Sequence, residues 1–148
     1  MKIKKIPSAL AGHSSDRAQI EVDIPFHDVD AWNRVWHGNY FKYFEAARTV
    51  LFRKKGLDVP ECLAKGYIWP VIDCGCRFLS PISYAMRIQV TAILEDIEHR
   101  VKVGYVLRDK NTGKKVAKGY TVQVAVHQKT GEMCLVTPDA FLRLLRAK

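Results

Sequence analysis

The sequence predicts a single α+β domain in which one long helix packs against an antiparallel sheet of about five strands. Three observations support this fold class. Apolar residues recur at helical spacing after residue 39, alternating apolar residues mark an early strand and several later ones, and tight turns separate the later strands. Strands joined by tight turns are antiparallel neighbours, and this order of elements fits an α+β layer arrangement.

The length of 148 residues and an apolar content of 48% fit one domain covering residues 1–148. A chain of this size buries roughly 70% of its unfolded surface, which is enough for a core without staples. We expect residues 1–17 to form a loose N-terminal arm. The sequence shows no signal peptide and no apolar run of membrane-spanning length, so the expected location is the cytoplasm.

The long helix is predicted to begin near Gly38 or Asn39 and to end at Gly56. Cations at positions 54 and 55 suit the negative end of the helix dipole, and glycine suits the left-handed residue that ends many helices. The apolar stripe is wide, so we expect the helix to be buried on most sides. This stripe contains Tyr40, Phe44, Ala47 and Leu51 at steps of four, three and four, with Phe41, Arg48 and Phe52 beside it.

Strands are predicted around the helix from the alternation of apolar residues. The first strand begins at Gln19, and the later strands cover residues 68–79, 88–94, 101–107 and 120–126. A hairpin loop at 109–113 and a turn at 128–131 separate strands, and residues 138–145 suit a short helix. One sheet against one helix leaves apolar surface and strand edges uncovered, so we expect a homodimer or homotetramer.

The net charge of +9 favours an anionic partner. Candidates are nucleic acid, an anionic membrane, an acidic carrier protein and a phosphorylated small molecule such as coenzyme A. The basic residues are scattered, and no nucleic-acid-binding motif is present, so nucleic acid is not the expected partner. Four basic residues are candidates for the CoA phosphates or a carrier surface, with an ordinary solvated hairpin as the alternative: Arg100, Lys102, Arg108 and Lys110.

The four cysteines do not predict a metal site. Cys74 and Cys76 are the only close pair, and one intervening residue is the wrong spacing for a zinc knuckle. On a strand, both side chains would point to one face, in or near the core. We therefore expect neither a metal nor a structural disulfide.

Residues 26–40 hold the polar groups best suited to chemistry. Asp28 and Asp30 stand two residues apart on a predicted loop, and His37 follows just before the helix. A helix N-terminus favours a nearby carboxylate, and its free N–H groups can hold an oxygen on which charge develops. One short segment can therefore supply a base or nucleophile together with an oxyanion site.

The same segment resembles the 4-hydroxybenzoyl-CoA thioesterase family of hotdog proteins. That family has an Asp-x-Asp loop, a glycine, a Val-aromatic-(His/Tyr)-x-Asn-Tyr run, and then aromatic residues, Glu and Arg on the helix. The resemblance continues through residues 78–81 and Tyr84. It implies the hotdog fold, in which the sheet wraps around the helix, and thioester hydrolysis as the activity. The matching residues are Asp28, Asp30, Val35, Trp36, His37, Asn39, Tyr40, Phe44, Glu45, Ala47 and Arg48.

The resemblance also implies roles for individual residues. Asp30 would attack the thioester carbonyl or activate a water, the helix start near Asn39 would polarise the carbonyl, and His37 would orient the substrate or water. No metal or separate cofactor is implied, since coenzyme A is part of the substrate. The expected substrate-binding residues are Trp36, Gly38, Tyr40 and Trp69.

Two positions depart from the family pattern, and several residues have simpler explanations. Asn33 stands where many relatives have glycine, and Ala85 and Met86 replace the family's usual Gly-Asp turn. Asp30 can also be a turn or capping acid, and Asp28 a structural partner of His27. Glu45 and Arg48 suit an ion pair, and packing alone would explain each tryptophan.

The sequence therefore predicts an enzyme that hydrolyses an acyl-CoA or acyl-carrier-protein thioester. One alternative is a hydroxyacyl thioester dehydratase of the same fold, which would also use His37 and Asp30. Another is a non-catalytic module that binds acyl-CoA or nucleic acid.

Overall fold

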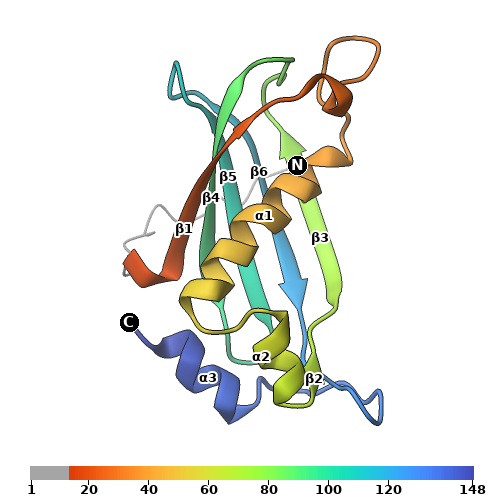
Figure 1. Ribbon diagram of the computed structural model, residues 1–148, viewed down its shortest axis with the longest axis vertical. Helices are drawn as coiled ribbons and strands as arrows, with labels where there is room; N and C mark the ends of the chain where they lie inside the picture. The colour runs from red at the N-terminus through yellow and green to blue at the C-terminus, as the bar shows by residue number, and fades with distance from the viewer. Residues whose placement is uncertain (1–13) are drawn as a thin grey trace, which may run out of the picture.

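The structure, a computed structural model that describes residues 14–148, has the predicted α+β architecture (Figure 1). A five-stranded antiparallel sheet has the order β1-β4-β5-β6-β3, and a two-stranded sheet pairs β2 with β7. Most of the predicted arm, residues 1–17, lies outside the described residues. The part of the arm that the structure describes forms a 3-10 turn at Ser14–Asp16, which leads into β1. The strands are β1 (Arg17–Asp23), β2 (Tyr67–Ile68), β3 (Val71–Phe78), β4 (Arg87–Asp96), β5 (Val101–Asp109), β6 (Lys115–Gln123) and β7 (Val126–His127).

The long helix α1 (Asn39–Lys54) lies across one face of the sheet, as predicted (Figure 1). The residues of its predicted stripe, Tyr40, Phe44, Ala47 and Leu51, are all buried. Phe44 stacks on Tyr105 of β5, with 4.4 Å between ring centroids. The same ring presses on Gly119 of β6, where an added Cβ would come within 2.5 Å of it. The helix therefore packs so closely on the sheet that only glycine fits at that point.

The end of α1 lies where the sequence predicts it. Gly56 has the expected left-handed conformation, with φ of 71°. Lys55, one of the two cations at this end of the helix, is buried. Its Nζ donates to Asp16 Oδ1 at 2.8 Å and to the carbonyl oxygen of Ala147 at 2.7 Å. A buried ammonium requires such partners, and these bonds join the two ends of the described chain to α1.

Two strands were predicted with wrong boundaries, and one short helix was not predicted. The strand expected over residues 68–79 is divided into β2 and β3 at Pro70, which cannot donate to a sheet ladder. The strand expected over residues 120–126 starts earlier, at Lys115, and ends at Gln123. A short helix α2 (Val59–Ala64) was missed because it has no buried residue and therefore no apolar period. Its start is fixed by Asp58, whose carboxylate accepts from Val59 N at 2.8 Å.

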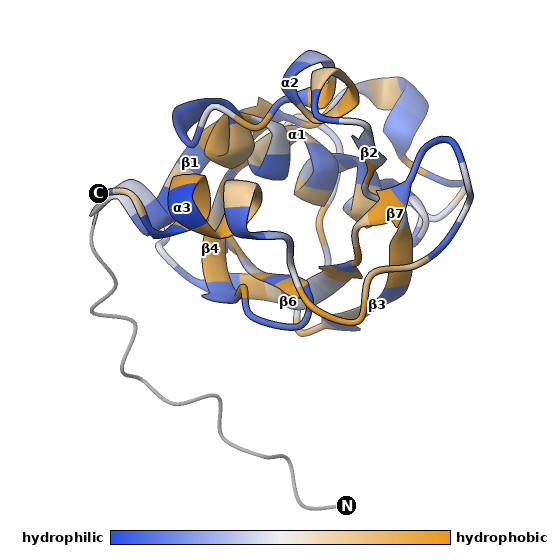
Figure 2. Cartoon of the chain, turned by 90° about the horizontal axis from the view of Figure 1, so that it is seen from below, coloured by the Kyte–Doolittle hydropathy of each residue, from blue (hydrophilic) through white to orange (hydrophobic). Residues whose placement is uncertain are grey.

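The C-terminal helix α3 (Asp139–Arg146) forms where the sequence predicts one, with Phe141 and Leu145 buried. The helices α2 and α3 both lie at the lower end of the molecule in Figure 1, and Figure 2 views the molecule from that end. Phe141 packs edge-on against Tyr67 and Trp69, so α3 closes the core beside β2.

The described residues contain no disulfide, since all four cysteines are free. Cys76 is partly buried against the core, but Cys74 is exposed, so the expectation that both lie in or near the core holds only for Cys76. Within residues 14–148, no His, Cys, Asp and Glu side chains cluster in a way that suits a metal ion. No helix in this part of the chain has the length and apolarity needed to span a membrane.

Candidate functional site

The loop between β1 and α1 is anchored by a buried carboxylate. Asp28, which is 1% exposed, accepts hydrogen bonds from Lys42 Nζ at 2.5 Å and Tyr43 Oη at 2.6 Å. Burial alone raises the pKa of Asp28, but the hydrogen bonds and the charge of Lys42 outweigh it and hold the pKa below its usual value. His27 Nε2 lies 3.5 Å from the same carboxylate. Asp28 thus fastens the loop to the first turns of α1.

Asp30 stabilises a tight turn and also faces an open hollow. Its Oδ1 accepts from Trp32 N at 2.9 Å and from Arg34 N at 3.2 Å. Asn33 adopts a left-handed φ of 56°, and its side chain accepts from Tyr84 N at 3.1 Å. The turn therefore forms with asparagine at the position where the family resemblance leads us to expect glycine. One oxygen of Asp30 supports the turn, and the residue still lines the hollow.

The hollow has a volume of about 430 Å³ and is bordered by the start of α1 and the end of β3. Asp30, His37 and Tyr40, three of the predicted site residues, line it together. Tyr40 is buried, and burial raises its pKa to about 12, so its phenol stays protonated near neutral pH. The remaining lining is Trp32, Arg34, Val35, Phe78, Leu79, Ser80, Pro81 and Ile82.

The first residues of α1 present open backbone donors. Gly38 is the N-cap residue and has no side-chain cap. In the described part of the chain, no acceptor binds the backbone N–H groups of His37 and Gly38. The ring of Trp36 lies over Gly38 so closely that an added Cβ would come within 2.2 Å of it. Glycine is therefore required here by close approach, since its φ of −66° is ordinary.

Asn39 does not face the hollow. Its Nδ2 donates to the backbone oxygen of Asp28 at 2.9 Å, so the side chain joins the loop to the helix. Trp36 packs against His37, with 4.9 Å between ring centroids, and does not line the hollow. The structure thus places these two predicted residues around the site rather than inside it.

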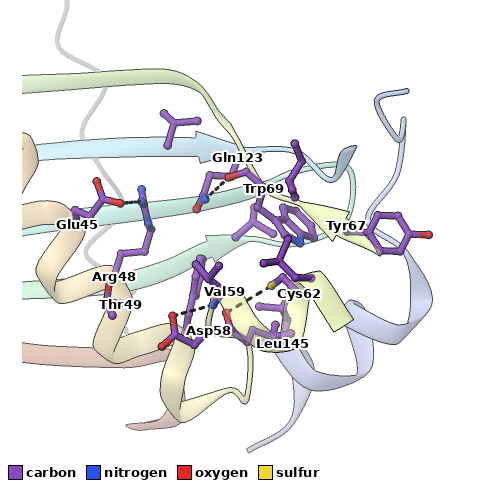
Figure 3. Close-up of a pocket in the computed structure, with 16 residues that line it drawn as sticks. Glu45, Arg48, Thr49, Asp58, Val59, Cys62, Tyr67, Trp69, Gln123 and Leu145 are labelled. Atoms are coloured by element: carbon purple, nitrogen blue, oxygen red, sulfur yellow. Dashed lines mark hydrogen bonds and ion pairs between the residues drawn. The ribbon is translucent and has the colours of Figure 1, made fainter. Parts of the chain in front are cut away.

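Trp69 lines a separate cavity of about 380 Å³, between the C-terminal half of α1, α2 and the start of β3 (Figure 3). At the rim, Arg48 Nη2 donates to Glu45 Oε1 at 2.9 Å, which confirms the predicted ion pair. The shape of this cavity was not predicted, because its walls come from segments far apart in the chain. The other lining residues are Thr49, Phe52, Leu57, Asp58, Val59, Cys62, Leu63, Tyr67, Ile68, Val71, Val101, Gln123 and Leu145.

The four basic candidates for phosphate binding do not come together. Arg100 and Lys102 lie at the start of β5, next to Asp96 and Glu95, whereas Arg108 and Lys110 lie at its other end. Lys110 pairs with Glu21, and Arg108 donates to the carbonyl oxygen of Gly113. A nine-residue strand separates the two pairs by roughly 25 Å.

A curated relative matches about half of the chain. A curated relative from Aquifex aeolicus, named "Putative esterase", is 31% identical over 74 residues, which cover 50% of this chain and 58% of that protein. The match thus spans less than two thirds of the relative's length.

Solved structures share the fold. A DHNA-CoA thioesterase from Staphylococcus aureus has a TM-score of 0.74 at 22% identity, over 80% of each chain. A mutant 4-hydroxybenzoyl-CoA thioesterase, solved with 4-hydroxybenzoyl-CoA, has a TM-score of 0.77 at 17% identity, over 88% of this chain and 99% of that one. The predicted hotdog architecture is thereby confirmed. Residues 24–145 match the family described as the Thioesterase-like superfamily, and the chain belongs to that superfamily.

Proposed function

We propose that the protein hydrolyses an acyl-CoA thioester to a free acid and coenzyme A. One observation carries the proposal: Asp30 and the start of α1 border the same open hollow. Membership of the superfamily supports the reaction type, and two solved relatives are named as thioesterases of aromatic acyl-CoA substrates. An acyl carrier protein is the other possible thiol carrier.

In the proposed reaction the thioester carbonyl binds in the hollow, with its oxygen toward the N–H groups of His37 and Gly38. These donors stabilise the negative charge that develops on the oxygen as the carbonyl is attacked. Asp30 removes a proton from a water, whose oxygen forms the new bond to the carbonyl carbon. The carbon–sulfur bond then breaks, and the thiolate takes the proton from Asp30. Alternatively, Asp30 attacks the carbonyl itself, and water hydrolyses the resulting anhydride.

We further propose that the protein acts as a homodimer joined through β3. In the described sheet β3 is an edge strand, and Val71, Ile72 and Phe78 on it are exposed. An exposed apolar edge is a template for pairing with another strand. The opposite edge, β1, is less suitable because Glu21 and Asp23 on it form ion pairs with Lys110 and Arg87.

Pairing of β3 with its copy about a twofold axis would make the two strands antiparallel. The end of one β3, beside the Asp30 hollow, would then face the start of the other β3, beside the cavity that holds Trp69. A thioester bound in the hollow of one subunit would have its acyl group directed at the cavity of the other. In the proposed dimer, the hollow of one subunit and the cavity of the other therefore bind two parts of the same substrate.

The test is thiol release from a panel of acyl-CoA and acyl-carrier thioesters by the wild-type protein and Asp30→Asn. Asparagine keeps the side-chain oxygen that accepts from Trp32 and Arg34, so the turn should survive while the base is lost. We expect kcat to fall by about 100-fold or more. The matched control, Asp23→Asn, removes an exposed carboxylate on the far edge of the sheet and should keep full activity. Full activity of Asp30→Asn, or inertness of the wild type on both carriers, would refute the proposal.

A further inference from the structure

Three exposed aromatic side chains lie together at one end of the molecule, on two loops. Trp32 is 82% exposed, Phe26 75% and Tyr84 52%, although tryptophan and phenylalanine are buried in most proteins. The rings of Phe26 and Tyr84 pack edge-on, with 5.8 Å between their centroids. The loops that carry the three rings, residues 24–38 and 79–86, lie at the same end of the sheet (Figure 1). We call these three side chains the aromatic tip.

The aromatic tip is held in place by bonds between the two loops. Tyr84 N donates to the side-chain oxygen of Asn33, the residue after Trp32, at 3.1 Å. Ala85 N donates to Ile24 O at 3.1 Å. Because the loops are joined in this way, the exposed rings lose little freedom when a partner binds them.

Four basic side chains on the face of the sheet opposite α1 form two like-charged pairs. Arg77 of β3 is directly opposite Lys118 of β6, and Arg108 of β5 is directly opposite Lys115 of β6. Among residues 14–148, no carboxylate forms an ion pair with any of the four. Like charges directly opposite each other destabilise a sheet, so these pairs favour an anion outside the chain.

The like-charged pairs lie near the same end of the sheet as the aromatic tip. β6 begins at Lys115, and the hairpin that precedes it projects at that end (Figure 1). Lys114 in this hairpin and Arg34 beside the aromatic tip add two cations that form no ion pair within the described chain. Against these six cations, the described residues at this end place only two carboxylates outside ion pairs, those of Asp30 and Asp109, since the others are paired. The end therefore carries an excess of positive charge.

Protruding aromatic rings together with an excess of cations fit the surface of an anionic membrane. Tryptophan and tyrosine rings suit the level of the lipid headgroups, where one end of the ring is apolar and the other wet. Lysine and arginine are attracted to anionic lipids. A single-stranded nucleic acid fits less well, because it needs rings interleaved with cations along one groove. Here the rings stand on loops, whereas the like-charged pairs stand on strands.

We infer that this end of the molecule binds the surface of an anionic membrane. The aromatic tip enters the headgroup layer, and the six basic side chains lie near the lipid phosphates. The contact is peripheral, because side chains of loops and strands make it. Trp32 also lines the hollow that holds Asp30, so the hollow lies next to the bound lipid. The inference concerns binding alone and goes beyond the proposed hydrolysis.

Co-sedimentation of the whole chain with lipid vesicles tests the inference. Vesicles of phosphatidylcholine alone are compared with vesicles that contain about one third phosphatidylglycerol, which is anionic. At about 50 mM salt we expect binding to the anionic vesicles to be tighter by about tenfold or more, because several cations contribute. Most of this difference should be lost at about 500 mM salt, where the charges are screened over a shorter range.

A double variant, Phe26→Ser with Trp32→Ser, tests the aromatic tip. Removal of two rings should weaken binding to the anionic vesicles by about tenfold or more, because membrane binding scales with the apolar area that enters the headgroup layer. Leu135→Ser is the matched control. Leu135 is 81% exposed but follows β7, at the other end of the sheet, so its replacement should leave vesicle binding unchanged.

A second double variant, Arg77→Gln with Lys115→Gln, tests the charges by removing one member of each like-charged pair. Binding to anionic vesicles should weaken by about tenfold or more. The variant should unfold at a temperature equal to or above that of the wild type, since it relieves both pairs. Lys129→Gln, in the turn after β7, removes a cation at the other end and should bind like the wild type.

Tryptophan fluorescence gives a readout in the wild-type protein, independent of any variant. Vesicles with brominated acyl chains should quench the fluorescence when they bind. Trp32→Phe keeps a ring in the aromatic tip and should still bind, but part of the quenching should be lost because Trp32 no longer reports.

The outcomes are distinct from those of the hydrolysis assay. Equal binding to neutral and anionic vesicles, or binding to neither, would overturn the inference, and so would binding without quenching. Binding of duplex RNA or of an acidic protein in place of anionic vesicles would assign this end to another partner and overturn it as well. Vesicle binding by a protein that is inert on every thioester would support this inference and refute the proposed function.

Discussion

At the scale of single residues, the two aspartates of the loop have different surroundings. Asp30 borders solvent and uses one oxygen to hold its own turn, whereas Asp28 is enclosed and receives hydrogen bonds from α1. Asp28 also offers its backbone oxygen to Asn39 and to Trp36 N. We therefore expect Asp28 to be a positioning residue, which keeps Asp30 and the helix start in register.

Replacement of Asp28 by asparagine should destabilise the protein in a pH-dependent way. At neutral pH we expect the free energy of unfolding to fall by about 1–2 kcal/mol, because Lys42 and Tyr43 lose a charged hydrogen-bond acceptor, while Lys42 itself is half exposed and stays solvated. The pKa of Asp28 is lowered on folding, so its contribution is fully present above the unfolded value of 3.8 and is lost as pH falls through the folded value. Denaturant unfolding at pH 7, 5 and 3 measures this.

The difference between wild type and Asp28→Asn should be constant from pH 7 to 5 and smaller at pH 3. Asp139→Asn is a suitable control, since Asp139 lies at the start of α3, away from the loop. A gap between wild type and Asp28→Asn that is as large at pH 3 as at pH 7 would contradict the assignment.

At the scale of elements, the turn that precedes β4 contains strain. Ala85 has a φ of 66°, in the left-handed region that alanine rarely adopts. The turn is held by Ala85 N, which donates to Ile24 O at 3.1 Å, and by Met86 N, which donates to Ser83 O at 3.3 Å. The departure from the family's Gly-Asp turn is therefore accommodated, and β4 starts at Arg87.

Ala85→Gly should stabilise the protein by about 0.5–1 kcal/mol. Release of the left-handed strain is worth roughly 1–2 kcal/mol, and the greater freedom of glycine in the unfolded chain offsets part of it. Ala46→Gly, at an exposed position inside α1, should instead cost about 1 kcal/mol. Thermal melting of both variants checks the opposite signs, and a loss of stability in Ala85→Gly would refute the strain argument.

The sequence was sufficient to predict the position of those elements whose apolar residues recur with a clear period. The stripe of α1 and its end at Gly56 were predicted because local spacing and a turn residue determine them. The helix α2 and the break at Pro70 were not predicted, since neither produces a period. Asp28 illustrates the limit for the site: its burial depends on Lys42 and Tyr43, one helical turn or more beyond the loop, and no local pattern reveals that contact.

At the scale of the whole molecule, the apolar edge of β3 predicts an oligomer. Ile72→Lys should disrupt the proposed dimer, because a lysine on an edge strand opposes strand pairing. Light scattering after size exclusion should give the mass of a dimer for the wild type and of a monomer for the variant. The monomeric variant should also have lower thioesterase activity, because the hollow of each subunit would no longer lie next to the partner's cavity.

Gln19→Lys places the same charge on the exposed face of β1, at the other edge of the sheet. It should leave the mass and the activity unchanged. A wild-type protein that is monomeric at micromolar concentration, yet fully active, would contradict the proposed dimer.

The buried ammonium of Lys55 has a consequence for the connectivity of the chain. Asp16 and the carbonyl of Ala147 bind the same nitrogen, so the two ends of the described domain meet at one point (Figure 1). Nearby termini make a domain suitable for circular permutation. A short linker from residue 148 to residue 16, with new ends opened in the 109–113 hairpin, should therefore yield a rearranged chain with the same hollow and cavity.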